Sequence, residues 1–286
     1  MDARGTPYGR LTNLDYDALQ SPLTVDSREH VILKFWMSQT TLVMALMLTG
    51  AMAAVALFLC WLSFASRFAA YAQSWKGVVP PFVAVPATLF GLLMTFLSQD
   101  VWDANRSAYR AIAMEREQLA TLAALSGNHG DNAEDIPRAV RDYVETAVGL
   151  EWKTMEDGKE SPETEAALNR LTRAVAGARI EAAFQRALVD TVMRLRSARE
   201  QRLAIAGAFP DDRKWAAVII IAFITQIALA VVHLDRPRPQ LLAQTIFALA
   251  AIVPISLVAS VDEPYSPPNA VSSEPLAQLL ERYPQK

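Results

Sequence analysis

The stretch PFVAVPATLFGLLMTFLSQDVWDANRSAYRAIAMEREQLATL, residues 81–122, changes from apolar to charged without losing its helical pattern. Its first part, up to Gln99, contains no charged residue, and from Asp100 onward apolar side chains recur every three or four residues between charges. Neither glycine nor proline occurs between Leu92 and Leu125, so the sequence predicts one continuous helix from about Pro81 to Leu125. A helix that leaves an apolar environment and continues into water is typical of a membrane span that extends into a soluble domain.

The composition of the chain points the same way. Of its 286 residues, 52% are hydrophobic and only 20% are charged, with a mean hydropathy of +0.17, whereas soluble domains have about 25% charged residues. The net charge of −3 gives no reason to expect nucleic-acid binding. The single cysteine, Cys60, excludes an intrachain disulfide, and the three histidines lie too far apart to predict a metal site.

Four apolar runs, residues 41–65, 78–99, 215–234 and 241–260, contain no Asp, Glu, Lys or Arg. Each run is long enough to cross about 30 Å of hydrocarbon as a helix. Four buried helices of a soluble protein are the alternative, but runs that are hydrophobic on every side are rarely needed in a globular core. The sequence therefore predicts an all-α polytopic membrane protein with four transmembrane helices.

The runs divide the chain into five parts. These are an N-terminal segment (1–35), the first two transmembrane helices (36–99), a helical extramembrane insert (100–214), the last two transmembrane helices (215–260) and a C-terminal tail (261–286). Within the insert, helices are expected at about 135–155, 161–176 and 181–206, with Ser161 capping the helix that begins at Pro162.

We expect the protein to lie in the cell (inner) membrane as a multi-pass protein, with the lipid bilayer as its surroundings. Lys and Arg flank both ends of the spans, and the positive-inside rule leans slightly toward a cytosolic insert.

Catalytic chemistry is not indicated. The spans carry no ionisable residue that could relay protons, and the chain has no nucleophile motif, no phosphate-binding glycine loop and no Cys/His cluster. We therefore expect no enzyme activity, no cofactor and no metal. Carboxylates of the insert, among them Glu115, Glu117, Asp142, Glu145 and Glu151, have arginines nearby at helical spacing, which predicts solvent-exposed ion pairs.

Two polar pairs interrupt the last two spans. Thr225-Gln226 and Gln244-Thr245 lie at similar distances from the short turn between these spans. Antiparallel packing would bring them to one depth, where they could hydrogen-bond to each other. A structural interhelical contact is the first interpretation, and the lining of a polar pore or cavity is the alternative.

The second span carries two stripes of different size. Small residues at positions 84, 87, 88, 91 and 95 favour close helix contact. Bulky apolar residues form another stripe, which we take as Val85, Leu89, Leu93 and Phe96. If several copies met around an axis, this stripe could form an apolar constriction that gates by dewetting. The alternative is that it faces lipid or a neighbouring helix.

Four segments resemble those of the bacterial bestrophin-like family, from about residue 75 to the C-terminus. They are VWDANRSAYRAIAMEREQLATL (101–122), VRDYVETAVGLEWKTMEDGKESPETEAALNRL (140–171), SAREQRLAIAGAFPDDRKWAAVI (197–219) and VDEPYSPPNAVSSEPL (261–276). The positions that carry the resemblance, and that we interpret as structural, are Trp102, Tyr143, Glu151, Trp152, Arg199, Arg202, Asp262 and Pro264.

This family is grouped with bestrophins, which are homopentameric anion channels with cytosolic helical domains. The resemblance implies that the second span lines the pore, with Val85-Pro86, Leu89 and Leu93 at the positions of the bestrophin constriction. Only Asp262 and Glu263 stand near the place of the bestrophin calcium clasp, so calcium gating is not expected.

Two functions remain open at this point. The first is an oligomeric, pentameric channel that passes small anions such as chloride. The second is a non-conducting membrane scaffold or sensor whose insert binds a partner protein.

Overall fold

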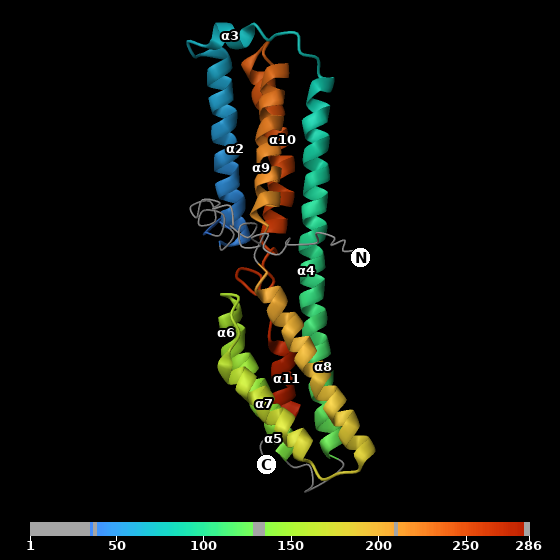
Figure 1. Cartoon of the computed structure of the whole chain (residues 1–286). Helices are drawn as coiled ribbons and strands as arrows, with labels where there is room; N and C mark the ends of the chain where they lie inside the picture. The colour runs from blue at the N-terminus through green and yellow to red at the C-terminus, as the bar shows by residue number, and fades with distance from the viewer. Residues whose placement is uncertain (1–34, 37–38, 128–134, 209–210, 283–286) are drawn as a thin grey trace, which may run out of the picture.

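The computed structural model describes residues 35–36, 39–127, 135–208 and 211–282, and every regular element in these ranges is helical. The N-terminal segment predicted at 1–35 lies almost entirely outside them. Two parts stack end to end along one long axis, a membrane half and the insert (Figure 1). Four helices are long and apolar enough to cross a membrane, so the prediction of an all-α protein with four transmembrane helices is confirmed.

The membrane half is a bundle of α2 (Thr41–Phe64), α9 (Asp212–Val232), α10 (Pro237–Ala259) and the first part of α4 (Pro81–Gly127). Its interior is apolar and includes Met52, Phe90, Met94, Trp215 and Ala251. Large apolar side chains of all four helices also remain exposed on the outside, as a surface in contact with lipid tails requires.

Short connections join the helices at the end of the bundle remote from the insert. The short helix α3 (Ala69–Gln73) lies across that end between α2 and α4 (Figure 1). Gly77 has a φ of +107°, which lets the chain turn into α4 without strain. The turn between α9 and α10 covers residues 233–236.

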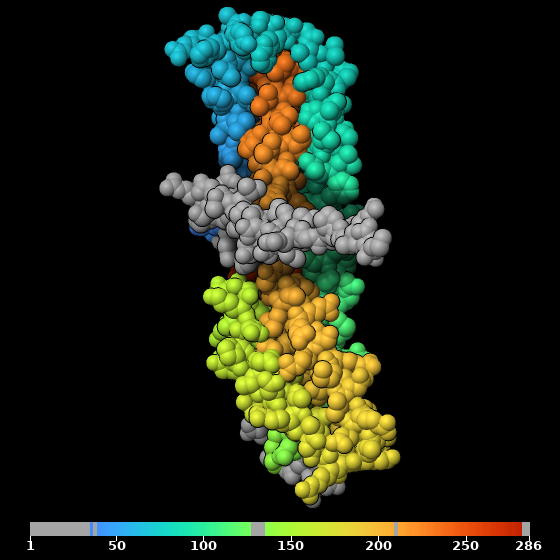
Figure 2. All heavy atoms as spheres, viewed as in Figure 1, coloured from blue at the N-terminus to red at the C-terminus, as the bar shows by residue number. Residues whose placement is uncertain are grey.

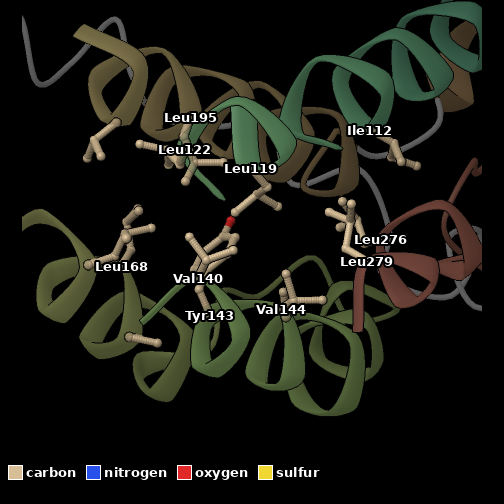
Figure 3. Close-up of a cluster of buried hydrophobic side chains, with 14 of the residues drawn as sticks. Ile112, Leu119, Leu122, Val140, Tyr143, Val144, Leu168, Leu195, Leu276 and Leu279 are labelled. Carbon is tan, nitrogen blue, oxygen red and sulfur yellow. The ribbon is translucent and has the colours of Figure 1, made fainter. Parts of the chain in front are cut away.

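The insert is formed by the second part of α4 with α5 (Asp135–Thr146), the π-helical turn η3 (Ala147–Glu151), α6 (Trp152–Met155), α7 (Pro162–Gly177) and α8 (Ala182–Ala206). Its core brings together Leu119 and Leu122 of α4, Val140 of α5 and Leu195 of α8 (Figure 3). The Ser161 side chain accepts a hydrogen bond from the Thr164 backbone and caps α7, as predicted.

The C-terminal tail belongs to the insert rather than standing apart from it. It contains α11 (Glu274–Arg282), a helix that was not predicted from the sequence. Leu276 and Leu279 of α11 are buried in the insert core beside Ile112 and Val144 (Figure 3). The chain thus leaves the membrane at Ala259 and returns to pack against α4 and α5.

A buried ionic network ties the insert helices together. The expectation of solvent-exposed ion pairs is wrong for Glu115 and Glu151, whereas Asp142 and Glu145 do form exposed pairs, with Arg170 and Arg141. Glu115 and Glu151 are both 0% exposed. The guanidinium of Arg202 donates to Glu115 Oε2 at 2.6 Å and to Glu151 Oε2 at 2.8 Å. Arg199 donates to Glu151 Oε1 at 2.6 Å and also pairs with Glu165. Charges removed from water in this way must be paired completely, because an uncompensated buried charge is strongly destabilising.

Aromatic residues complete the network. The Tyr143 hydroxyl donates to Glu115 Oε1 at 2.5 Å, and the Arg202 guanidinium lies 4.8 Å from the Trp152 ring centroid. Burial, followed by the charge of Glu115, raises the pKa of Tyr143 well above its usual value, so the hydroxyl stays protonated as a donor. Burial alone would raise the pKa of Glu151, but its bonds to Arg199 and the charge of Arg202 outweigh burial and the pKa is lowered.

We predict that Glu151→Gln destabilises the protein by about 3–5 kcal/mol, because it leaves two buried guanidinium groups without their shared counter-ion. Thermal unfolding of the purified full-length protein in detergent measures this effect. The matched control is Arg194→Gln, which removes an exposed Asp190–Arg194 pair on α8 and should change stability by less than about 0.5 kcal/mol. Equal shifts for the two variants would contradict a structural role of the network.

Candidate functional site

The membrane part of α4 has one buried face. Phe90, Met94, Leu97 and Val101 are turned into the bundle and are at most 8% exposed. Pro86 is buried on the same side, inside the helix. These residues follow one another every three or four positions, so a single stripe fastens α4 to the other membrane helices, chiefly α9.

A bulky apolar face of α4 is exposed in the subunit. Val85, Leu89 and Phe96 are 64%, 45% and 60% exposed, and Leu92, at 49%, lies on the same face. Leu93 lies about 80° around the helix from Val85; it is half buried and packs against the apolar core of the membrane half. Leu92, which the sequence analysis did not single out, therefore continues the exposed face that Leu93 was expected to share.

Next to it runs a face of small residues that is also exposed: Ala84, Thr88, Gly91 and Thr95. A methyl group added at Gly91 would meet no atom within 4 Å. The Thr95 hydroxyl donates to the Gly91 carbonyl at 2.8 Å, so its polar group is satisfied within the helix. A second helix could approach the backbone closely along this face.

The two polar pairs of α9 and α10 do not form the mutual hydrogen bonds that we expected. The hydroxyls of Thr225 and Thr245 donate to the Ile221 and Leu241 carbonyls of their own helices, at 2.7 and 2.8 Å. Gln226 Nε2 donates to the Met52 carbonyl of α2 at 3.3 Å. The Gln244 amide is buried and makes no hydrogen bond to any described residue.

Gln240 of α10 bonds both α9 and α2. Its Nε2 donates to the Ala230 carbonyl at 3.1 Å and to the Ser63 hydroxyl at 3.3 Å. The amides of Gln226, Gln240 and Gln244 are 0% exposed inside the bundle, away from the exposed faces of α4. Gln240 could have been suspected from its place in the first turn of α10, where an apolar helix begins.

The junction between the two halves is held by residues of the C-terminal tail. The buried Trp215 indole donates to Asp262 Oδ2 at 2.9 Å. Asn105 of α4 donates to the Val261 carbonyl. Trp152 Nε1 donates to the Val271 carbonyl at 3.0 Å, and the Val271 amide donates to the Pro264 carbonyl at 2.7 Å.

The residues that carry the family resemblance therefore fall into two groups. Tyr143, Glu151, Trp152, Arg199 and Arg202 lie in or beside the ionic network, and Asp262 and Pro264 lie at the junction. Trp102 stands apart, 44% exposed on α4.

Burial raises the pKa of Asp262 to about 6, with smaller increases from Glu263 and Asp212, while the bond from Trp215 and the charge of Lys214 lower it. Folding therefore makes the neutral acid more favourable than it is in the unfolded chain. Stability gained from protonation of Asp262 is fully present below its unfolded pKa and is lost as pH rises through about 6.

We predict that Asp262→Asn, which removes this titration, becomes more stable relative to the wild type as pH rises from about 4 to about 7. Melting temperatures of the two proteins, recorded side by side across that range, test the prediction. Curves that run parallel would show that the Asp262 carboxyl is not shifted.

Comparison with known proteins supports this architecture. The model of the Bestrophin-like domain family matches residues 50–276. Two variants of a bacterial bestrophin homologue from Klebsiella pneumoniae have solved structures similar to this one. The first has a TM-score of 0.65 and 9% sequence identity, covering 84% of this chain and 98% of the homologue. The second has a TM-score of 0.66 and 11% identity, covering 83% and 96%.

A third solved structure, titled as a membrane protein, has a TM-score of 0.65 and 11% identity over 84% of this chain and 96% of its own. At such identities the likeness shows a shared fold. No curated protein matches the chain. The family match extends from α2 into α11 and covers well over half of the sequence, so this chain belongs to the Bestrophin-like domain family.

Proposed function

We propose that the protein is an oligomeric channel that passes small anions such as chloride through a pore lined by α4. The observation that carries the proposal is the pair of neighbouring exposed faces on this helix. Its bulky face (Val85, Leu89, Leu92 and Phe96) and its small face (84, 88, 91 and 95) are centred about 100° apart around the helix.

Apolar exposure alone does not distinguish α4, because α2 and α10 expose similar side chains to lipid, such as Leu46 and Leu242. On α4 the small and the bulky residues occupy separate faces, whereas on α2 the exposed small residues Gly50, Ala53 and Ala54 lie among the bulky ones. In a ring of subunits, a lining helix needs one face toward the axis and an adjacent face against the next subunit. Small residues on the adjacent face allow the helix backbones to approach closely. Membership of the Bestrophin-like family supports this arrangement, and the resemblance to bestrophins favours a pentamer.

The chemistry of such a lining suits weakly selective passage. Residues 78–99 contain no charged side chain. The lining would therefore offer a permeating anion no fixed positive charge to bind to. An anion with a low free energy of partial dehydration passes such an apolar constriction more easily than a strongly hydrated anion. The narrow apolar segment would also gate by dewetting. Because the proposed role needs no bond-making group, we infer a channel rather than an enzyme.

We further propose an inner-membrane location with the insert in the cytosol. Counted along the sequence, the flanks of the spans on the insert side carry Arg28, Lys34, Arg106, Arg110, Arg213 and Lys214. The opposite side carries Arg67, Lys76, Arg236 and Arg238. The positive-inside rule favours the first side only slightly, so the orientation rests mainly on the resemblance to bestrophins.

We predict that the purified protein conducts chloride in liposomes and that Leu89→Ala and Leu92→Ala raise the flux about tenfold by widening an apolar constriction. The matched control is Leu242→Ala, the same truncation at an exposed position of α10, 62% exposed, which should leave the flux unchanged. Equal effects at Leu89 and Leu242 would contradict a pore-lining role. Absence of chloride flux in every protein would favour the scaffold or sensor.

A second prediction concerns the small face. Gly91→Leu should break up the oligomer, because a side chain would occupy the space needed by the neighbouring helix. Gly50→Leu on α2 is the control, since Gly50 is also exposed and a methyl group there also meets nothing within 4 Å. The mass of each variant in detergent, measured by light scattering, shows whether the oligomer is still formed. An oligomer that survives Gly91→Leu intact would remove the small face from the subunit interface.

A further inference from the structure

The end of the membrane half remote from the insert has an unusual surface. It is formed by residues 61–80, which include α3, and by residues 233–238 at the turn between α9 and α10. We call these residues the end face. In Figure 1 they close the bundle at the top, and in Figure 2 residues 61–80 form most of that surface in the view shown.

Hydrogen bonds hold this surface in a defined shape. The Ser66 hydroxyl donates to the Leu62 carbonyl at 2.8 Å and accepts from the Phe68 backbone amide at 3.1 Å. Gln73 Nε2 donates to the Ser63 carbonyl at 3.0 Å, which ties the end of α3 back to α2. The connection is therefore preformed and lies against the helix ends.

Aromatic side chains point out of the end face. Trp61, Phe68, Tyr71 and Trp75 are between 50% and 67% exposed. The Tyr71 and Trp75 rings contact each other edge to face, with centroids 5.6 Å apart. Such side chains at the ends of membrane spans are typical of the headgroup level of a bilayer, where one part of the ring is apolar and another is hydrated.

The charge of the end face is positive. Arg67, Lys76, Arg236 and Arg238 are all exposed, and Asp235 is its one acid, so the net charge is +3. The pairing of Lys76 with Asp235 is long, at 3.9 Å, and exposed, which makes it weak. The three other cations have no ion pair among the described residues that would neutralise them.

The opposite end of the same four spans has a net charge of the opposite sign. Residues 99–110, 211–214 and 261–263 carry six acids against four cations, a net charge of −2. Exposed aromatic rings occur at both ends, since Trp102 and Tyr109 lie at the insert end, but among the described residues only the end face combines such rings with a net positive charge. An ordinary solvent-facing loop needs neither this asymmetry nor these rings.

We propose that the end face binds anionic phospholipids, with the four cations contacting headgroup phosphates while the aromatic rings insert at the level of the glycerol backbone. A bilayer surface can contact all of these side chains at once, because they belong to the segments that join the spans at one end of the bundle. The α3 helix lies nearer to α2 than to α4 (Figure 1), to one side of the faces assigned above to neighbouring subunits. The proposal holds whether or not the protein conducts ions.

The test measures lipid binding to the full-length protein in detergent by native mass spectrometry. Phosphatidylglycerol and phosphatidylcholine with the same acyl chains are titrated separately. We expect phosphatidylglycerol to bind more tightly to the wild type. The double variant Arg67→Gln with Lys76→Gln should lose about tenfold or more in affinity for phosphatidylglycerol, since each cation near an anionic surface contributes about fivefold.

The control is Arg106→Gln with Arg110→Gln, which removes two exposed cations from the other end of the spans and should leave phosphatidylglycerol binding unchanged. Equal affinity for the two lipids would overturn the proposal, as would equal losses in the two double variants. Competition by soluble glycerol phosphate at the same concentration would also overturn it, by indicating a site for free anions. A change of subunit count in the end-face variant would instead assign the surface to a contact between copies.

Discussion

The uninterrupted backbone of α4 is the constraint on which the other parts of this structure depend. One helix of 47 residues serves two environments, and a single stripe is buried along its whole length. This stripe begins with Phe90 and Met94 among the membrane helices and continues with Ile112 and Leu119 in the insert core. Because an α-helix resists twisting about its axis, packing in the insert also fixes which face of α4 is exposed in the membrane.

The ionic network restricts the rotation of α4 about its own axis. Buried ion pairs add little net stability compared with apolar packing, but they tolerate few alternative arrangements, since every charge must keep its partner. Glu115 lies on the buried stripe of α4 and is held by Arg202 of α8. A rotation of α4 that exposed another face would withdraw this carboxylate from its guanidinium. We infer that the network acts as a registration device between the insert and the membrane half.

Much of the fold could be predicted from the sequence, because span length, apolar content and helix caps are local properties. The four spans and the continuous α4 are of this kind. Features that depend on tertiary contacts, such as the buried ionic network, could not be predicted in the same way. Glu115 and Arg202 are 87 positions apart in the sequence. When each carboxylate was compared only with neighbours on its own helix, its ion pair was expected to be exposed to solvent. The α4 stripe was predicted with Leu93 in place of Leu92 because a spacing of four residues drifts around a helix with 3.6 residues per turn.

The π-helical turn η3 has a consequence for how this domain tolerates insertions and deletions. A π-helical turn holds one residue more than an α-helical turn, and η3 ends at Glu151, directly before Trp152. Losing a single residue from Ala147–Leu150 would remove the extra residue and restore ordinary α-helical winding, so the chain beyond it would keep nearly the same direction. A residue lost from the α-helical part of α5 would instead rotate Glu151 and Trp152 by about 100° about the helix axis, away from Arg199 and Arg202. The segment between Tyr143 and Glu151 can therefore absorb a one-residue deletion in η3 more easily than in α5.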